Sequence, residues 1–263
     1  MDEDPLKAIR AKKESSIIGC MQLLKEKKVE AVFSAGSTGA TLISAITILG
    51  KQKGVIRPAI ASVLPTINGS VILLDSGASL DVKPKVLYQF AVMGSKLAEV
   101  LLDIDAPRVG LLNNGEEESK GRDLEKSAYK LLSSSNLNFI GNVEGRDFAN
   151  EKVDVFVTDG FTGNVVLKTL EGTARLQQKL ISDSLNRNLL KPLLPIVKNA
   201  FKPVKDKLNP DKTNASYLLG VDGLVTIGHG SSKQEAIKNG IKYTSSSIQK
   251  DFIGKFSETL KEL

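Results

Sequence analysis

Polar, glycine-containing loops follow several short apolar runs in this chain. One runs from Asp159 to Asn164, where Gly160, Thr162 and Gly163 separate the run VDVFVT from an apolar helical pattern. Glycine lets a backbone approach a ligand closely, and a helix N-terminus offers free N–H groups beside a positive dipole end. The loop therefore predicts an anion site with Thr162 and Asn164 as neutral donors. The alternative is ordinary turn chemistry and helix capping.

The same unit of strand, loop and helix recurs along the chain. It occupies residues 30–50, 71–94, 108–132, 157–172 and 223–243. Alternating strands and helices form a mainly parallel sheet covered by helices on both faces, so we predict an α/β fold. In such a sheet, loops at the carboxyl ends of parallel strands share one edge, where ligands bind. We therefore expect all five loops to gather along one edge.

Several familiar site motifs are absent from the sequence. The loop 36–39 reads GSTG but lacks the Gly-Lys-Ser/Thr of a Walker A loop, and no Gly-x-Gly-x-x-Gly dinucleotide fingerprint occurs. There is no Gly-x-Ser-x-Gly elbow, and His229 is the only histidine, which disfavours a Ser/His/Asp triad. With one histidine and one cysteine, a usual zinc cluster is excluded. We expect neither a metal nor a cofactor.

Composition limits the cellular setting of the chain. Its 263 residues are 41% hydrophobic and only 5% aromatic, as expected for a core of aliphatic residues around buried strands. Cys20 is the only cysteine, which suits a reducing compartment, and we expect it in the core. The N-terminus is polar, and no stretch approaches the length of a membrane span. We expect a cytoplasmic protein that is at most peripheral to a membrane.

Nine pieces of sequence, in their order along the chain, carry a family resemblance. They are DPLKAIRAKKESSI, SAGSTGA, RPAIASVLPT, LLDSGAS, QFAVMGSKLAE, PRVGLLNNGEEESKG, NFIGNVEGRD, VTDGFTGNVVLKTLEG and HGSS. Together they resemble the PlsX-type phosphate acyltransferases, and the match runs nearly end to end. The resemblance implies a Rossmann-like three-layer α/β/α sandwich, a homodimer, no cofactor, and one domain over residues 1–263.

The resemblance also implies a reaction. A long acyl chain passes from acyl carrier protein to inorganic phosphate, which gives acyl phosphate for bacterial phospholipid synthesis. A downstream glycerol-phosphate acyltransferase is then a further possible partner.

The chain departs from the family pattern in three places. Members usually begin with a strand and a glycine-rich loop ahead of the segment DPLKAIRAKK, so we expect a first strand–loop–helix unit to be missing here. Ser37 and Ser79 stand where the family typically has asparagine. Serine keeps a hydroxyl but loses the paired donors of the amide, so substrate contacts there are expected to differ.

Lys120 and His229 are the two predicted catalytic residues. The family carries a lysine followed by glycine at the position of Lys120, which we expect to neutralise phosphate or the oxyanion; the alternative is a solvated lysine beside Glu116, Glu117 and Glu118. His229 is expected to protonate the leaving thiolate or to bind phosphate; the alternative is a histidine bonded to backbone at a helix start.

The remaining residues that we expect to contact substrate lie in the same loops. Asp75 and Asp159 each end a strand, where they orient a lysine or the phosphate-binding backbone, or act as caps. Lys168 lies one turn into the fourth helix. The full set is Gly36, Ser37, Thr38, Gly39, Asp75, Ser79, Asn113, Gly115, Glu116, Asp159, Gly160, Thr162, Gly163, Asn164, Lys168, Gly230 and Ser231.

A basic, amphipathic segment spans residues 186–213. Seven cations and two anions lie between Arg187 and Lys212, an excess of five positive charges. Apolar residues recur at helical spacing and the prolines indicate two short helices with a bend, so we expect a protruding hairpin that docks on anionic membrane. The expected membrane-binding residues are Leu190, Leu193, Leu194, Val197, Phe201, Lys191, Lys198 and Lys202.

Other readings remain open for this segment and for the chain. The segment could instead pack on the core or a dimer interface, and its lysines could recruit the acidic carrier protein. The chain could be a truncated, non-catalytic module that binds membrane or acyl carrier protein, or a short-chain phosphate acetyltransferase. Nucleic-acid binding is poorly supported, because the charge lies beside aliphatic residues without an aromatic stacking platform.

Overall fold

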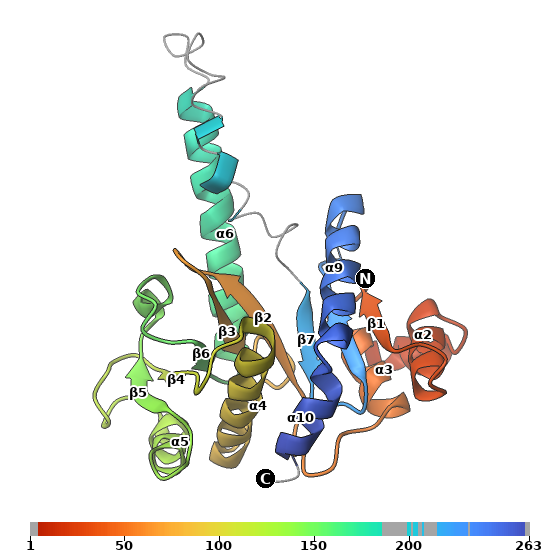
Figure 1. Ribbon diagram of the computed structural model, residues 1–263, viewed down its shortest axis with the longest axis horizontal. Helices are drawn as coiled ribbons and strands as arrows, with labels where there is room; N and C mark the ends of the chain where they lie inside the picture. Colours follow the sequence, from red (N-terminus) through yellow and green to blue (C-terminus); the bar gives the residue numbers. More distant parts are fainter. Residues whose placement is uncertain are drawn as a thin grey trace.

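The computed structural model describes residues 5–185, 199–200, 202–204, 207, 215–230 and 232–260. It is a three-layer arrangement with one central sheet and helices on both faces (Figure 1). This confirms the predicted α/β fold. Each of the five recurring units contains the expected strand followed by the expected helix.

The elements follow one another in this order: α1 (Pro5–Ala11), α2 (Ser16–Lys25), β1 (Ala31–Ser34), α3 (Thr38–Ile48), β2 (Ala59–Pro65), β3 (Ser70–Leu74), α4 (Pro84–Leu102), β4 (Val109–Leu112), α5 (Asp123–Ser133), β5 (Phe139–Val143), the 3₁₀ helix η1 (Gly145–Ala149), β6 (Val155–Val157), α6 (Gly160–Leu185), β7 (Ser216–Leu219), β8 (Leu224–Ile227), α9 (Gln234–Gln249) and α10 (Phe252–Leu260).

The strands form one sheet in the order β1-β8-β7-β2-β3-β6-β4-β5. Four pairings are parallel, namely β1 with β8 and those joining β3, β6, β4 and β5. The three pairings between β8, β7, β2 and β3 are antiparallel. Three reversals leave β1 and β8 pointing opposite to β3, β6 and β4, so the prediction that all five loops share one edge is wrong.

The reversal comes from strands that the recurring pattern does not contain. β2 and β3 form a hairpin across the turn at Asn68 and Gly69, with Ala61 paired to Leu74 and Pro65 to Ser70. β7 then pairs with both β2 and β8. β7 and β2 therefore lie between the two parallel groups, with β1 and β8 on one side and β3, β6, β4 and β5 on the other.

Helices α4 and α6 cover opposite faces of the same strands. α4 packs against β3, β6, α5 and α10, and its side chains Leu87, Phe90 and Met93 are fully buried. Each large apolar side chain buried in this way stabilises the fold by about 1.5–3 kcal/mol. On the other face, Val166 and Leu167 of α6 pack on a separate cluster that contains the stacked rings of Phe148 and Phe156.

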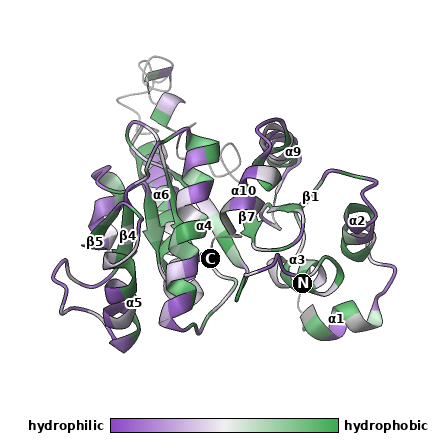
Figure 2. Cartoon of the chain, turned by 60° about the horizontal axis from the view of Figure 1, so that its bottom comes forward, coloured by the Kyte–Doolittle hydropathy of each residue, from purple (hydrophilic) through white to green (hydrophobic). Residues whose placement is uncertain are grey.

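α6 extends well beyond the sheet (Figure 1). Its outer part carries exposed apolar side chains, among them Leu176 and Leu180, each 57% exposed. Within the described residues, no helix has both the length and the apolar content needed to cross a membrane. The strands of the central sheet are largely hydrophobic, whereas α5 shows many hydrophilic residues (Figure 2).

Cys20 lies on the surface, so the prediction that it belongs to the core is wrong. α2 buries Ile18, Met21 and Leu24, which recur every three residues along one side. Cys20 falls between two of these positions and therefore points away from the core.

Candidate active site

A cavity of 290 Å³ lies at the junction of the two strand groups. The loops after β1, β3, β6 and β8 all contribute to it, although their strands run in opposite directions, because they converge over β2. Both aliphatic side chains and charged or polar groups line it. Its lining includes Thr38, Gly39, Leu42, Ile60, Ser62, Leu64, Ser76, Gly77, Asn164, Leu167, Lys168, Glu171, Ser216, Ile227, His229 and Gly230.

Three ionisable side chains meet in the lining of this cavity. Oε1 of Glu171 lies 2.8 Å from Nε2 of His229, and Oε2 of Glu171 lies 3.1 Å from Nζ of Lys168. The Nζ atom of Lys168 is 3.5 Å from Nε2 of His229. Glu171 is only 11% exposed, whereas Lys168 is 51% exposed. A largely buried carboxylate thus holds together a cation and an imidazole that both line the cavity.

Glu171 is the site residue that sequence reasoning missed. Asn164, Lys168 and Glu171 follow one another at spacings of four and three on α6, which places them on one helical face. That spacing is the sequence signal that could have found Glu171. Burial alone would raise the pKa of Glu171, but hydrogen bonds from His229 and Lys168 outweigh it and lower the pKa to about 2.

This depressed pKa predicts a pH dependence of stability. The folded pKa lies below the unfolded one, so the ionised Glu171 stabilises the fold above about pH 4.5, and this stabilisation is lost as the pH falls toward 2. We expect the free energy of unfolding of the wild type to exceed that of Glu171→Gln most at pH 5, and the difference to shrink on acidification. Urea unfolding at pH 5, 4 and 3 measures it.

The matched control removes His229 instead. In His229→Asn the carboxylate keeps only the Lys168 partner, so its pKa is raised toward the ordinary value and the loss of stability should begin at higher pH. A difference between wild type and Glu171→Gln that stays constant from pH 5 to pH 3 would contradict this account of the cluster.

Asp75 holds the loop after β3 rather than lining the cavity. Its carboxylate is fully buried and accepts backbone N–H bonds from Ile60, Gly77, Ala78 and Ser79. Burial raises the pKa of Asp75, and the four backbone donors oppose this rise. Of the three roles predicted for Asp75 (orienting a lysine, orienting backbone, capping), these contacts match the positioning of backbone.

The first turn of α6 is pressed onto this loop. Gly160 donates its N–H to the carbonyl oxygen of Ser79 at 2.9 Å, and a Cβ atom on Gly163 would lie 1.9 Å from the carbonyl oxygen of Asp75. A side chain at Gly163 would displace backbone, which explains why the loop needs glycine there. Ser79 donates its hydroxyl to the carbonyl oxygen of Pro58 at 3.3 Å.

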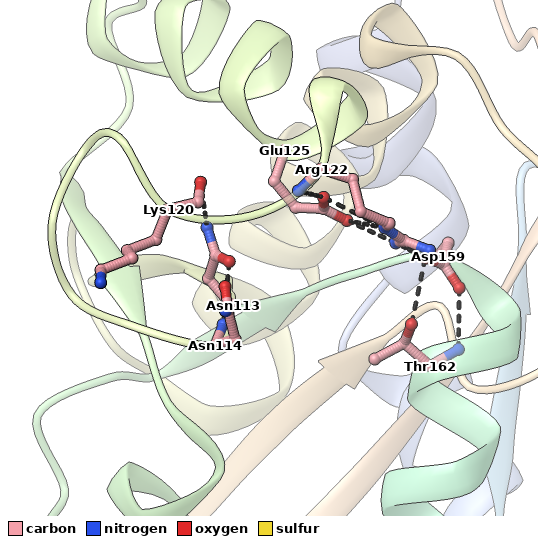
Figure 3. Close-up of polar contacts among 7 residues, drawn as sticks. All are labelled: Asn113, Asn114, Lys120, Arg122, Glu125, Asp159 and Thr162. Carbon is pink, nitrogen blue, oxygen red and sulfur yellow. Dashed lines mark hydrogen bonds and ion pairs between the residues drawn. The ribbon is translucent and has the colours of Figure 1, made fainter.

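Asp159 caps α6 and ties it to α5 (Figure 3). It accepts hydrogen bonds from the backbone N–H of Thr162 at 2.7 Å and from the hydroxyl of Thr162 at 3.1 Å. Arg122 forms an ion pair with both Asp159 and Glu125. Thr162 is therefore committed to its own cap, while Asn164 faces the cavity.

The β1–α3 loop divides its residues in a similar way. Ser37 caps α3, its hydroxyl accepting from the backbone N–H of Ala40 at 3.4 Å, and the backbone N–H of Gly36 bonds to the hydroxyl of Ser34. Thr38 and Gly39 lie in the lining of the cavity. Only the second half of the loop therefore meets the predicted substrate space.

The predicted residues of the β4–α5 loop lie outside this cavity. The side-chain amide of Asn113 donates to the carbonyl oxygen of Lys120 at 3.2 Å, and the side chain of Lys120 lies against Gly115. The ammonium group of Lys120 points away from Asp159 and lies 3.9 Å from the carboxylate of Glu117 (Figure 3). Glu116 forms an ion pair with Lys152 at 3.4 Å.

Some predicted residues fall outside the described part of the chain. They are Ser231 and, in the basic segment, Leu190, Leu193, Leu194, Val197, Phe201, Lys191 and Lys198. Lys202 is described and exposed. Among the residues that the structure describes, no group of three or more His, Cys, Asp or Glu side chains could hold a metal ion.

Comparison with known proteins decides the family. A family model described as "Fatty acid synthesis protein" matches residues 1–255. The chain belongs to this family. A phosphate acyltransferase of Thermoanaerobacterium thermosaccharolyticum is 45% identical over 253 residues, which are 96% of the chain and 76% of the relative. One of Elusimicrobium minutum is 42% identical over 263 residues, 100% of the chain and 77% of the relative. The chain thus spans about three quarters of these family members.

Solved structures share the fold at low sequence identity. The EutD phosphotransacetylase from Staphylococcus aureus matches with a TM-score of 0.57 and 14% identity, over 88% of the chain and 67% of that protein. A branched-chain phosphotransacylase from Enterococcus faecalis matches with a TM-score of 0.54 and 11% identity, over 88% and 78%. These likenesses confirm the α/β architecture.

Proposed function

We propose that this chain transfers a long-chain acyl group from acyl carrier protein to inorganic phosphate, releasing the carrier thiol and forming acyl phosphate. As a member of the fatty acid synthesis family, the chain is an acyltransferase. The observation that carries the finer proposal is the cavity itself. It sets a lysine and a histidine, held by one carboxylate, beside an aliphatic wall.

Phosphate supplies the nucleophile in this reaction. One of its oxygens attacks the thioester carbonyl carbon, the carbonyl oxygen becomes an oxyanion, and the C–S bond then breaks to release thiolate. Lys168 offsets the charge on phosphate, and the amide of Asn164 donates a hydrogen bond. Holding the two reactants in contact supplies a large part of the rate, roughly 7 kcal/mol in favourable cases.

His229 is suited to protonate the leaving thiolate. The ionised carboxylate of Glu171 is acceptor-only, so Nε2 of His229 must carry the hydrogen that joins them. Nδ1 is then the unprotonated ring nitrogen. It accepts the proton of the attacking phosphate oxygen and passes it to the leaving thiolate, so the imidazole ends the step as it began. The hydrogen bond from Nε2 to Glu171 holds the ring of His229 in the cavity lining, which makes Glu171 a positioning residue.

The aliphatic wall provides the place for the acyl group. Leu42, Ile60, Leu64, Leu167 and Ile227 face the same space as the polar cluster. Burying a methylene group stabilises a complex by about 0.8 kcal/mol, so such a wall favours a chain of carbons over water. The thioester carbonyl would then lie at the boundary between wall and cluster.

Product analysis tests the proposal. The chain is incubated with palmitoyl-acyl carrier protein and ³²P-labelled orthophosphate, and the extractable lipid is examined. We expect label in a lipid that releases palmitate and orthophosphate on hydrolysis. Label that stays wholly in the aqueous phase while the thioester is consumed would contradict transfer to phosphate. Binding of the carrier without either change would support the non-catalytic module.

Membrane docking through residues 186–213 belongs to the same proposal, together with homodimer formation and handover to a glycerol-phosphate acyltransferase. The sequence of this segment supports it, with five excess positive charges beside a helical apolar stripe. We expect flotation with anionic vesicles to be lost in Leu194→Glu and Val197→Glu, because a carboxylate opposes both burial and the anionic surface. Undiminished flotation would contradict docking through this segment. Lys126→Glu, at an exposed position of α5, is the control.

A further inference from the structure

A second cavity lies across the first turn of α6 from the first one. It measures 510 Å³ and lies between the β4–α5 loop, the start of α5 and Thr162 of α6. Thr162 faces this cavity and Asn164 faces the first. Residues two positions apart on an α-helix, such as Thr162 and Asn164, project about 200° apart, and the helix is roughly 10 Å across. One helix diameter therefore separates the two cavities. The lining of the second is Leu112, Asn113, Asn114, Gly121, Arg122, Glu125 and Thr162.

The charges of the second cavity are already neutralised. The guanidinium of Arg122 binds the carboxylates of Glu125 and Asp159, which are 8% and 2% exposed (Figure 3). These two partners raise the pKa of Arg122 further above its usual value. One cation between two buried anions leaves no net positive charge for an anion, so the cavity favours a neutral polar ligand.

Hydrogen-bonding groups without a partner remain in this cavity. Arg122 uses Nε and Nη2 for its two carboxylates, which leaves Nη1 free of hydrogen bonds within the described part of the chain. The side-chain amide of the exposed Asn114 likewise has no partner among the described residues. A guanidinium donor beside an amide matches a ligand that carries amide groups.

An exposed aromatic ring lies on the way from one cavity to the other. Phe161 is 61% exposed although it belongs to the first turn of α6. At 100° per residue it projects between Asn164 and Thr162, on the side of the helix opposite Gly163, which is pressed onto Asp75. A flexible ligand that spans both cavities would cross this ring and cover it.

We propose that the second cavity binds the pantetheine arm of the thioester donor. The arm carries two amides for Asn114 and Arg122, and its two methyl groups cover Phe161, while the thioester end reaches the first cavity. This inference rests on the proposed function. Both acyl carrier protein and coenzyme A present the same arm, so the cavity recognises a chemistry that the two donors share.

Matched thioesters test the proposal. The donors carry one acyl chain on pantetheine or on ethanethiol, which lacks the amides. Asn114→Trp fills the cavity from an exposed position, and Asn136→Trp, in the exposed connection after α5, is the control. We expect Asn114→Trp to lower kcat/KM for the pantetheine thioester about tenfold, as for one lost hydrogen bond, and to change the ethanethiol value less than twofold. Asn136→Trp should change neither.

The outcomes separate this proposal from the proposed function. Equal loss with both thioesters would overturn the pantetheine subsite, and so would loss with acyl carrier protein but not with acyl-coenzyme A. If no thioester is transferred to phosphate, the proposed function fails, and titration of the chain with free pantetheine decides alone. Shifts of α5 and α6 amide resonances that vanish in Asn114→Trp and persist in Asn136→Trp support the subsite. Absence of shifts in the wild type overturns it.

Discussion

Gly163→Ala will lower the free energy of unfolding by about 3 kcal/mol or more and abolish most of the activity. The added Cβ would lie 1.9 Å from the backbone oxygen of Asp75, a separation that no rotamer change can relieve. Either the first turn of α6 or the loop after β3 must move, and both border the cavity. Urea unfolding and the phosphate-dependent transfer assay measure the two effects.

Gly172→Ala is the matched control, because it makes the same change on the same helix. A Cβ there meets nothing within 4 Å. In the helix interior alanine is favoured over glycine by up to about 1 kcal/mol, so this variant should be slightly more stable than the wild type and equally active. If Gly163→Ala behaved like Gly172→Ala, the close contact between α6 and Asp75 would be refuted.

Lys168→Met will lower kcat/KM for phosphate about 100-fold to 1000-fold, the usual cost of removing one well-placed charged donor. Lys168 lines the cavity, with its ammonium held by Glu171. Methionine keeps the length of the side chain but not the charge, so the loss reports electrostatics more than packing. Steady-state rates at varied phosphate concentration give the value.

Two lysine variants complete this experiment. Lys179→Met removes an exposed charge from the same helix and should leave the rate within twofold of wild type. Lys120→Met tests the family-based hypothesis for Lys120, which remains a prediction, since Lys120 lies beside Glu117 and not in the lining of this cavity. Normal activity of Lys168→Met together with an inactive Lys120→Met would move the phosphate site to the β4–α5 loop.

The sequence predicts the recurring units well because each strand and helix shows its own periodicity of hydrophobic residues. The strands β1, β3, β4, β6 and β8 all end at the polar loops that the pattern indicates. The edge at which those loops lie is a property of β2 and β7, whose pairings reverse the strand direction. β2 with β3 and β7 with β8 are hairpins of neighbouring strands, whereas β2 with β7 joins Ala59 to Leu219. Nothing local in AIASVLP or SYLL encodes that distant pairing, so the single-edge prediction failed.

The candidate site shows the same division between local and distant information. The glycines at 160 and 163 are explained by contacts with the loop after β3, 81 or more positions earlier in the chain at Asp75 and Ser79. The loop pattern in the sequence singles out these two glycines, but it does not predict which residues they contact. Glu171 went unnoticed because only the tertiary fold brings His229 to that face of α6.

The central claim is that this chain uses inorganic phosphate to release a carrier thiol. The most direct measurement is the rate of thiol release from palmitoyl-acyl carrier protein by the 263-residue chain, with and without phosphate. We predict release that requires phosphate, saturates with it, and falls at least 100-fold in Lys168→Met. Release at the same rate without phosphate, or no release with it, would contradict the account.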